Sequence, residues 1–260
     1  MPLQHSHSIR AIRERIQAKK KNSYVSDWIL GGIDGAVTTF AIVSGVVGAA
    51  LEWQVIIILG LANLLADGFS MAASNYSAVK SEADDVERLW AMEQQHIREV
   101  PEGEREEMRQ ILIAKGLTGS TLEEAVDAVT ANERTWIETM LVEEFGVLPD
   151  GRNPVRAGLA TFSAFLVCGA VPLLPFVFDI AVPFAWSVGA TGVVFFVIGA
   201  AKSLWALAPW WRSGLETLAI GMVAAGVVVS FSFFMPEYAD QLLSAGGLIA
   251  GASIFLNRAF

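Results

Sequence analysis

The sequence predicts an all-α, polytopic membrane protein, and its composition is the first reason. Of 260 residues, 53% are hydrophobic and only 17% are charged, whereas about a quarter are charged in an ordinary soluble protein. The mean hydropathy is +0.48. These values exclude intrinsic disorder and argue against a simple soluble globule. The net charge of -9 argues against a nucleic-acid partner, and the single cysteine, Cys168, excludes an intrachain disulfide or a cysteine-cluster metal site.

The second reason is that five apolar stretches are long enough to cross a bilayer, which takes about 20 residues in a helix. They cover residues 29–51, 53–79, 157–178, 180–201 and 213–236. A shorter stretch at 241–257 is rich in glycine, alanine and serine. We therefore expect five core transmembrane helices and a candidate sixth segment.

The third reason is that the charges gather outside these stretches and divide the chain. Residues 82–150 hold 18 acidic and 6 basic side chains, a net charge of -12, while six basic side chains and one acidic lie in the first 22 residues. Since Lys and Arg favour the cytoplasmic side, we expect four parts. These are a basic cytoplasmic arm (1–25), transmembrane helices 1 and 2 (26–81), an acidic, helical, cytoplasmic domain (82–150) whose candidate metal ligands are described below, and the remaining membrane helices with the candidate sixth segment (151–260).

The acidic domain reads as four helices. The first continues from the second span, and Pro101 ends it. The others are expected at 103–115, at 122–130 with Ser120 and Thr121 as its cap, and from Asn132 or Thr135 to about residue 146.

Four residues inside the apolar stretches have side chains that could bind a metal ion. Asp34 lies in the first stretch, and Asn63, Asp67 and Met71 follow one another at four-residue intervals in the second, so the three share one helix face. Charges at bilayer depth are costly and mark functional sites. Carboxylate, amide and thioether ligands suit a divalent transition metal better than calcium or magnesium. The alternatives are a structural hydrogen bond for Asp34 and core packing for Met71.

The acidic domain contains three pairs at one-turn spacing: Glu93 with His96, Glu104 with Glu107, and Met140 with Glu144. Each pair can point at one ion, although a solvated acidic face is the alternative for any single pair. The Glu93-x-x-His96 spacing is also that of di-iron carboxylate bundles. Those need a second Glu-x-x-His, and the other histidines, His5 and His7, lie in the basic arm, so a ferroxidase is poorly supported.

The residues from about 26 to 235 resemble the vacuolar iron transporter family. The resemblance rests on the segments GIDGAVTTFAIVSG (32–45), ADGFSMA (66–72), Asn75-Tyr76, Lys80-Ser81-Glu82 and RSGLE (212–216). It implies a five-helix membrane unit that forms a homodimer with the ion path at the dimer interface. It also implies proton-coupled export of ferrous iron, and often manganese, from the cytosol.

The resemblance assigns metal contacts to Asp34 and Met71 in the membrane and to five residues of the acidic domain. These five are Glu93, Glu104, Glu107, Met140 and Glu144. Three positions depart from the family pattern. Asn63 stands where plant members carry glutamate, His96 replaces a glutamate, and Leu141 replaces a second methionine. Asp67, one turn after Asn63, can supply the missing charge.

The sequence thus predicts a non-enzymatic, proton-coupled divalent metal transporter in a lipid bilayer, the plasma membrane if the protein is bacterial. Fe2+ is the expected cargo, with Mn2+ as the runner-up and Co2+ and Zn2+ as further candidates, and no prosthetic group is expected. The rival readings are a membrane-anchored metal sensor and a membrane-bound ferroxidase.

Overall fold

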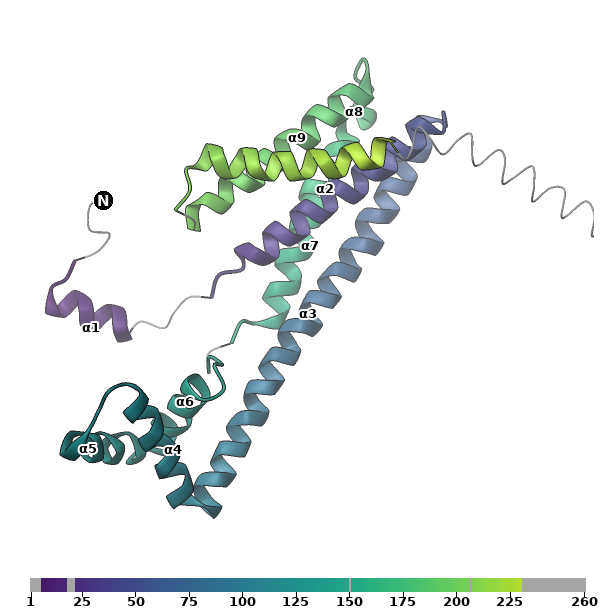
Figure 1. The fold of residues 1–260 in the computed structure, drawn as a ribbon. Coiled ribbons are helices and arrows are strands. Elements are labelled where there is room, and N and C mark those ends of the chain that lie inside the picture. The colour runs from purple at the N-terminus through teal and green to yellow at the C-terminus, as the bar shows by residue number, and fades with distance from the viewer. Residues whose placement is uncertain (1–5, 18–21, 150, 206, 231–260) are drawn as a thin grey trace, which may run out of the picture. The chain divides into compact units, whose positions relative to one another are not determined.

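The structure is a computed structural model that describes residues 6–17, 22–149, 151–205 and 207–230. That part of the chain is helical and contains no strand, which confirms the all-α prediction. The helices are α1 (Ile9–Gln17), α2 (Val25–Gly48), α3 (Trp53–Glu99), α4 (Pro101–Ala114), α5 (Gly119–Thr130), α6 (Glu133–Glu143), α7 (Pro154–Ala170), α8 (Leu174–Val177) and α9 (Pro183–Lys202). Short 3-10 turns lie at Val171–Leu173 and Ser203–Trp205, and a last helix covers Trp210–Ser230 (Figure 1).

Five helical segments are long and apolar enough to cross a membrane, as predicted. They are α2, α3, Pro154–Val177, α9 and Trp210–Ser230. The third is interrupted after Ala170, because Pro172 and Pro175 lack the amide hydrogens that a continuous helix needs. The candidate sixth segment at 241–257 lies outside the described residues.

The chain forms two compact units. Among the described residues, the membrane unit contains residues 24–80 and those from 153 to 230, and the insert unit contains those from 81 to 152 together with residues 6–17, 22 and 23. Helix α3 belongs to both: at 47 residues it is about 70 Å long, more than twice the thickness of a hydrocarbon core. Its apolar stretch at 53–79 is the membrane-spanning part, and the residues from Ser81 onward belong to the insert unit.

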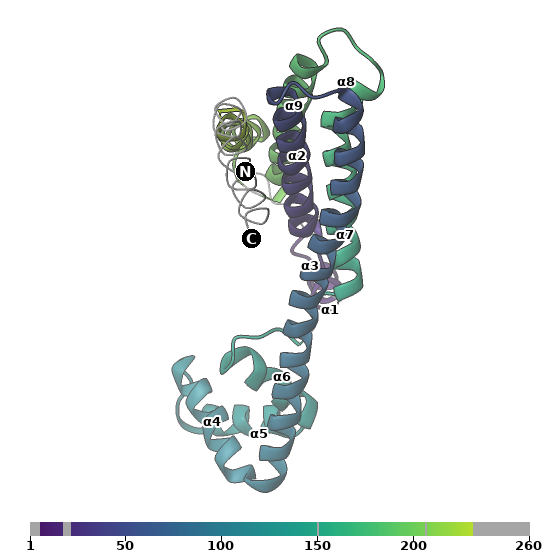
Figure 2. The ribbon, with the colours of Figure 1, turned by 90° about the vertical axis from the view of Figure 1, so that its right-hand side faces the viewer.

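In the membrane unit, α2 packs along α7 and α9, as Figures 1 and 2 show. The contact with α7 depends on glycine. A Cβ atom on Gly31 would lie 2.2 Å from the carbonyl oxygen of Thr161, and one on Gly35 would lie 2.5 Å from that of Phe165. Gly169 of α7 in turn approaches the backbone of Gly35. Small residues at four-residue spacing are how membrane helices reach such close contact.

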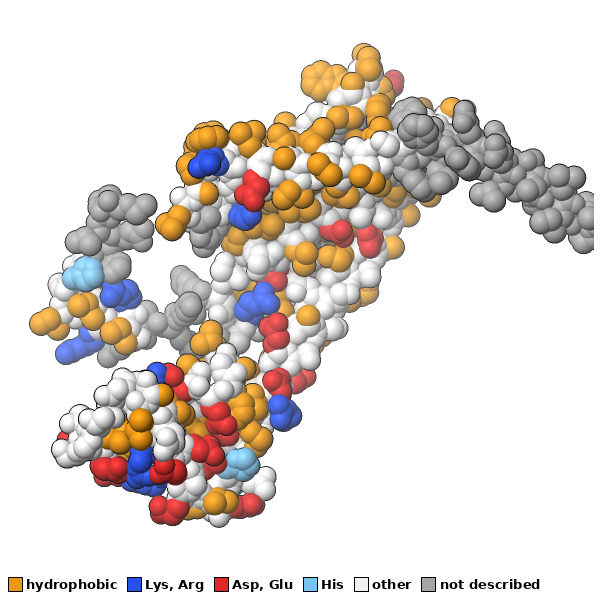
Figure 3. Space-filling model, viewed as in Figure 1, with side chains coloured by type: hydrophobic (Ala, Val, Ile, Leu, Met, Phe, Trp, Pro, Cys, Tyr) orange, Lys and Arg blue, Asp and Glu red, His pale blue; other side chains and the backbone are white. Residues whose placement is uncertain are grey.

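Large apolar side chains remain exposed on the outside of this unit, among them Leu61, Leu65 and Phe69 of α3. In Figure 3 the visible face of the membrane unit is mainly hydrophobic, whereas acidic side chains gather on the insert unit. An apolar exterior is stable in lipid and costly in water, so the surface agrees with a membrane setting.

The insert unit folds around two small apolar clusters, one of Leu89, Ile137 and Leu141 and one of Met108, Trp136 and Met140. Helix α4 begins at Pro101, and the Asn132 side chain caps α6 by accepting a hydrogen bond from the amide of Thr135 at 3.0 Å.

The predicted cap of α5 is wrong. This helix begins at Gly119 with Thr118 as its N-cap residue, so Ser120 and Thr121 lie inside it. Gly119 has φ +63, a conformation that glycine adopts without steric cost, which lets the chain enter the helix before the residues predicted to cap it.

We predict that Gly31→Ala destabilises the membrane unit, because the added methyl group would overlap the α7 backbone. Overpacking of this kind costs roughly 1–3 kcal/mol, so the thermal unfolding midpoint in detergent should fall. Gly45→Ala is the matched control in α2, since a Cβ there meets nothing within 4 Å and alanine favours a helix. Equal midpoints for the two variants would contradict the close contact.

Candidate metal centre

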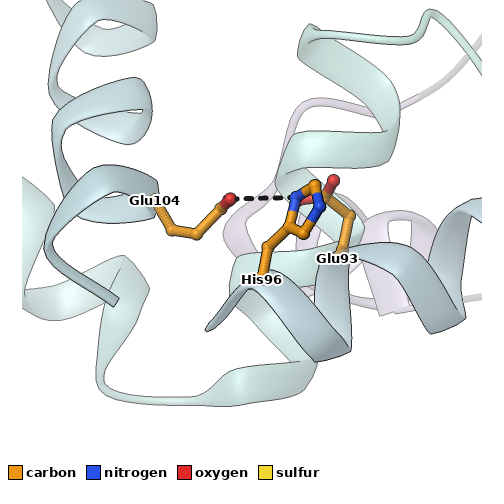
Figure 4. Close-up of side chains that lie close together, drawn as sticks. All are labelled: Glu93, His96 and Glu104. Atoms are coloured by element: carbon orange, nitrogen blue, oxygen red, sulfur yellow. Dashed lines mark ion pairs between the residues drawn. The ribbon is translucent and has the colours of Figure 1, made fainter. Parts of the chain in front are cut away.

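Three predicted ligands come together in the insert unit. Glu93 and His96 lie one turn apart near the end of α3, and Glu104 faces them from the first turns of α4 (Figure 4). One ligand atom from each lies within 4.8 Å of the others, and His96 Nδ1 is 3.3 Å from Glu104 Oε1. Within the described residues, no other group of three or more His, Cys, Asp or Glu side chains converges in this way.

The two carboxylates are unusually buried for acidic residues. Glu93 is 1% exposed and Glu104 is 4% exposed, whereas the His96 side chain is 46% exposed. The Oε2 atoms of both glutamates are buried without a hydrogen-bond partner. A buried carboxylate oxygen without a partner is costly, and a cation bound here would supply the missing interaction.

The raised pKa values of the carboxyl groups also favour a bound cation. The pKa of Glu93 is raised from its ordinary 4.5 to about 7. Burial is the largest cause, followed by the charges of Glu104 and Glu144, a hydrogen bond with Glu104, and the charge of Glu107. Burial and Glu107 also raise the pKa of Glu104, against the opposing effect of His96. Burial, Glu107 and Glu104 raise the pKa of Glu144. The carboxyls therefore repel one another, and a divalent ion would relieve that repulsion.

The remaining predicted ligands of this unit lie in different environments. Glu107 and Glu144 are exposed and act on the cluster through their charge. Met140 is fully buried in the apolar cluster with Met108 and Trp136. Sequence reasoning did not single out Met108, although it stands four residues after Glu104 on the same helix face. The structure thus brings three predicted ligands into one centre and places two acidic neighbours around it.

In the membrane unit, Asp34 is partly buried and lines a cavity of about 520 Å³ between α2, α9 and the helix Trp210–Ser230. Lys202 and Thr217 line the same cavity. Asp67 of α3 is close enough to Asp34 for the two charges to repel each other. The fold therefore brings together two carboxylates that are 33 positions apart in the sequence (67 − 34).

The predicted face of α3 points into the unit. Asn63, Asp67 and Met71 are all partly buried. The Asn63 side chain donates a hydrogen bond to Thr38 Oγ1 at 3.1 Å, and Met71 packs against the apolar core that includes Phe165. Asn63 therefore has a structural partner on α2, and Met71 has a packing role beside its proposed ligand role.

Sequence reasoning missed a buried polar network at one end of the membrane unit. Asn75 Nδ2 lies 2.9 Å from Asp27 Oδ1 and 2.7 Å from Thr161 Oγ1, both of which accept from it. Asp27 is 3% exposed and Thr161 is fully buried. The network joins α2, α3 and α7. The available signal was the spacing, since Asn75 extends the series of Asn63, Asp67 and Met71 by one more turn.

Comparison with known proteins finds one family model and relatives that bear one name. The sequence model of the VIT family matches residues 25–232. The chain is 34% identical to a vacuolar iron transporter of Toxoplasma gondii over 78% of its own length and 69% of that protein. It is 32% identical to vacuolar iron transporter 1 of Oryza sativa, over 77% of this chain and 81% of the relative. For vacuolar iron transporter 1 of Arabidopsis thaliana the identity is 31%, with coverages of 77% and 82%.

We predict that the metal-free insert unit loses stability as the pH rises. Between about 4.5 and about 7 the native Glu93 holds a proton that the unfolded chain has released. The contribution of Glu93 to the free energy of unfolding is therefore largest below pH 4.5 and is lost as the pH rises through about 7. Thermal unfolding of the chelator-treated protein across this range measures the slope.

Glu93→Gln should flatten that slope and raise the midpoint at neutral pH, because the amide cannot ionise. Glu87→Gln, at an exposed position of the same helix, is the control and should leave the slope in place. A slope unchanged in Glu93→Gln would show that the pH dependence arises elsewhere.

Proposed function

The chain belongs to the VIT family, and from this membership we propose that it transports ferrous iron across a membrane. The observation that carries the proposal is a pair of carboxylate sites in one multi-pass protein. One is the cluster of Glu93, His96 and Glu104, in which two buried carboxylate oxygens have no hydrogen-bond partner and could bind a cation. The other is Asp34, placed inside an apolar span beside a cavity. The vacuolar iron transporter names of the relatives support iron as the cargo.

The insert unit acts as the collector of metal. Its predicted range, 82–150, has a net charge of -12, which raises the local concentration of cations, an effect that salt screens. The cluster then supplies directional ligands, with Glu107 and Glu144 as neighbouring charges. The excess of basic residues in the N-terminal arm supports a cytoplasmic location for the arm and the insert unit. Metal is therefore gathered from the cytosol.

The membrane unit carries the ion onward through Asp34, with Asp67 and Met71 contributing oxygen and sulfur ligands. Two carboxylates that repel each other favour either a bound divalent ion or a bound proton between them. Exchange of one for the other couples metal export to proton entry. The protein works as a homodimer, as the resemblance to the family implies.

Metal uptake into proteoliposomes with an imposed pH gradient tests the proposal. Ferrous iron under reducing conditions should enter faster with the gradient than without it, and Mn2+, Co2+ and Zn2+ are compared in parallel. A metal sensor would bind ions at the insert unit and produce no flux. A ferroxidase would consume oxygen when ferrous iron is added.

We predict that Asp34→Ala abolishes this flux while the protein stays folded, because it removes the carboxylate at membrane depth. Flux at equal reconstituted protein and the thermal midpoint are both measured. Glu52→Ala, in the exposed link between α2 and α3, is the control and should transport normally. Wild-type flux in Asp34→Ala would exclude Asp34 from the path.

We also predict that Asp67→Asn damages exchange more than Asn63→Ala does. Only Asp67 can bind and release a proton, whereas the Asn63 amide already donates a hydrogen bond to Thr38. Initial rates with and without the pH gradient separate the loss of coupling from the loss of transport. If Asn63→Ala proves the more harmful change, Asp67 is not the coupling group.

A further inference from the structure

The donor atoms of the insert cluster lie close enough together for small side-chain movements to place them around one divalent ion. Transition-metal bonds to nitrogen or oxygen ligands are about 2.0–2.2 Å long, so two ligands of the same ion lie at most about 4.4 Å apart. The ligand atoms of Glu93, His96 and Glu104 lie within 4.8 Å of one another. Three ligands of one ion lie closer together than this limit, because only one pair of them can stand on opposite sides. The His96–Glu104 pair, at 3.3 Å, already has a suitable spacing, and closing the whole site requires side-chain movements of about an ångström.

The charges of the cluster separate inner ligands from outer ones. Glu93 and Glu104 are buried and carry the orphaned oxygens, and as two carboxylates they neutralise one divalent ion. Glu107 and Glu144 are exposed and repel the inner pair through space. They attract any cation, with no preference for one metal over another.

His96 differs from all four glutamates in chemistry and in position. It is the only nitrogen donor of the cluster, with Nδ1 directed at Glu104 Oε1 (Figure 4). Its half-exposed ring leaves one side of the site open to water, which suits an ion that must be passed on. Imidazole favours iron, cobalt, nickel, copper and zinc, while sites built from oxygen alone suit magnesium, calcium and manganese.

We infer that His96 is the specificity-determining residue of this cluster, which it makes selective for Fe2+, Co2+ and Zn2+ as a class over Mn2+, Mg2+ and Ca2+. The inference rests on the proposed function for the role of these ions as cargo. It adds that the insert unit sorts the cytosolic ions before they reach the membrane unit. The insert unit would then bind manganese, the runner-up cargo from the sequence, only weakly.

The test is metal binding to the full-length, chelator-treated protein in detergent. Co2+ serves as the probe because its visible absorption changes with the ligands and geometry around it, and Zn2+, Mn2+ and Mg2+ are added as competitors. The quantity measured is the ratio of the Mn2+ and Zn2+ dissociation constants. Subtracting the signal of Glu93→Gln/Glu104→Gln isolates the cluster from the membrane site.

His96→Glu should lower this ratio by about tenfold or more, through weaker Zn2+ and stronger Mn2+ binding, because an oxygen donor replaces nitrogen. His96→Ala, as a second variant, should weaken Zn2+ and Co2+ at least about tenfold and change Mn2+ little. Glu107→Gln is the control. It should weaken every ion by a similar factor and leave the ratio unchanged, because it removes only long-range attraction.

A ratio that stays at the wild-type value in both His96 variants would overturn the inference. Wild-type Co2+ binding by Glu93→Gln/Glu104→Gln would overturn it too, because the cluster would then bind no metal. Failure of the proposed function looks different: no flux in proteoliposomes, with the change in ratio intact, refutes transport and leaves the selectivity of His96 standing.

Discussion

The membrane unit depends on the close contact between α2 and α7. Gly31 and Gly35 bring the two backbones so near that a single methyl group would not fit. Because the helices touch here, Thr161 of α7 reaches the buried network of Asp27 and Asn75. The same contact orients α2, so that Asp34 faces both the cavity beside α9 and the charge of Asp67. In lipid there is little hydrophobic force between helices, and backbone proximity with a few buried hydrogen bonds takes its place.

The buried carboxylates of the insert unit differ from the one in the membrane unit. In the membrane unit the buried carboxylate Asp27 has hydrogen-bonding partners, whereas Glu93 and Glu104 each keep one buried oxygen without a partner. This arrangement costs stability at neutral pH, since burial and then repulsion between the carboxylates raise the pKa of Glu93 to about 7. A divalent ion bound between the two glutamates would remove that cost. Binding free energy and folding free energy are therefore linked in this unit, as expected where ligands are held ready for a cation.

One helix carries residues of both sites. Asp67 and Met71 lie in the apolar part of α3, and Glu93 and His96 lie near its end in the insert unit. The candidate ligands of the membrane unit and those of the insert unit differ in chemistry. The membrane set combines carboxylate with thioether and contains a group that can take up a proton, while the insert set combines carboxylate with imidazole. Such a division suits a protein in which one site selects the ion and the other exchanges it.

The sequence by itself determined the features that follow from local periodicity and composition. The five spans, the continuation of α3 beyond the membrane, the break at Pro101 and the pairing of Glu93 with His96 are of this kind, because helix geometry relates residues three or four positions apart. Only the tertiary structure decided which of the acidic residues are buried and which elements face each other. It placed Glu104 opposite Glu93, left Glu107 and Glu144 exposed, enclosed Met140 in an apolar cluster and assembled the Asp27 network. Those outcomes depend on contacts between helices that are distant in sequence, and periodicity within one helix carries no information about its neighbours.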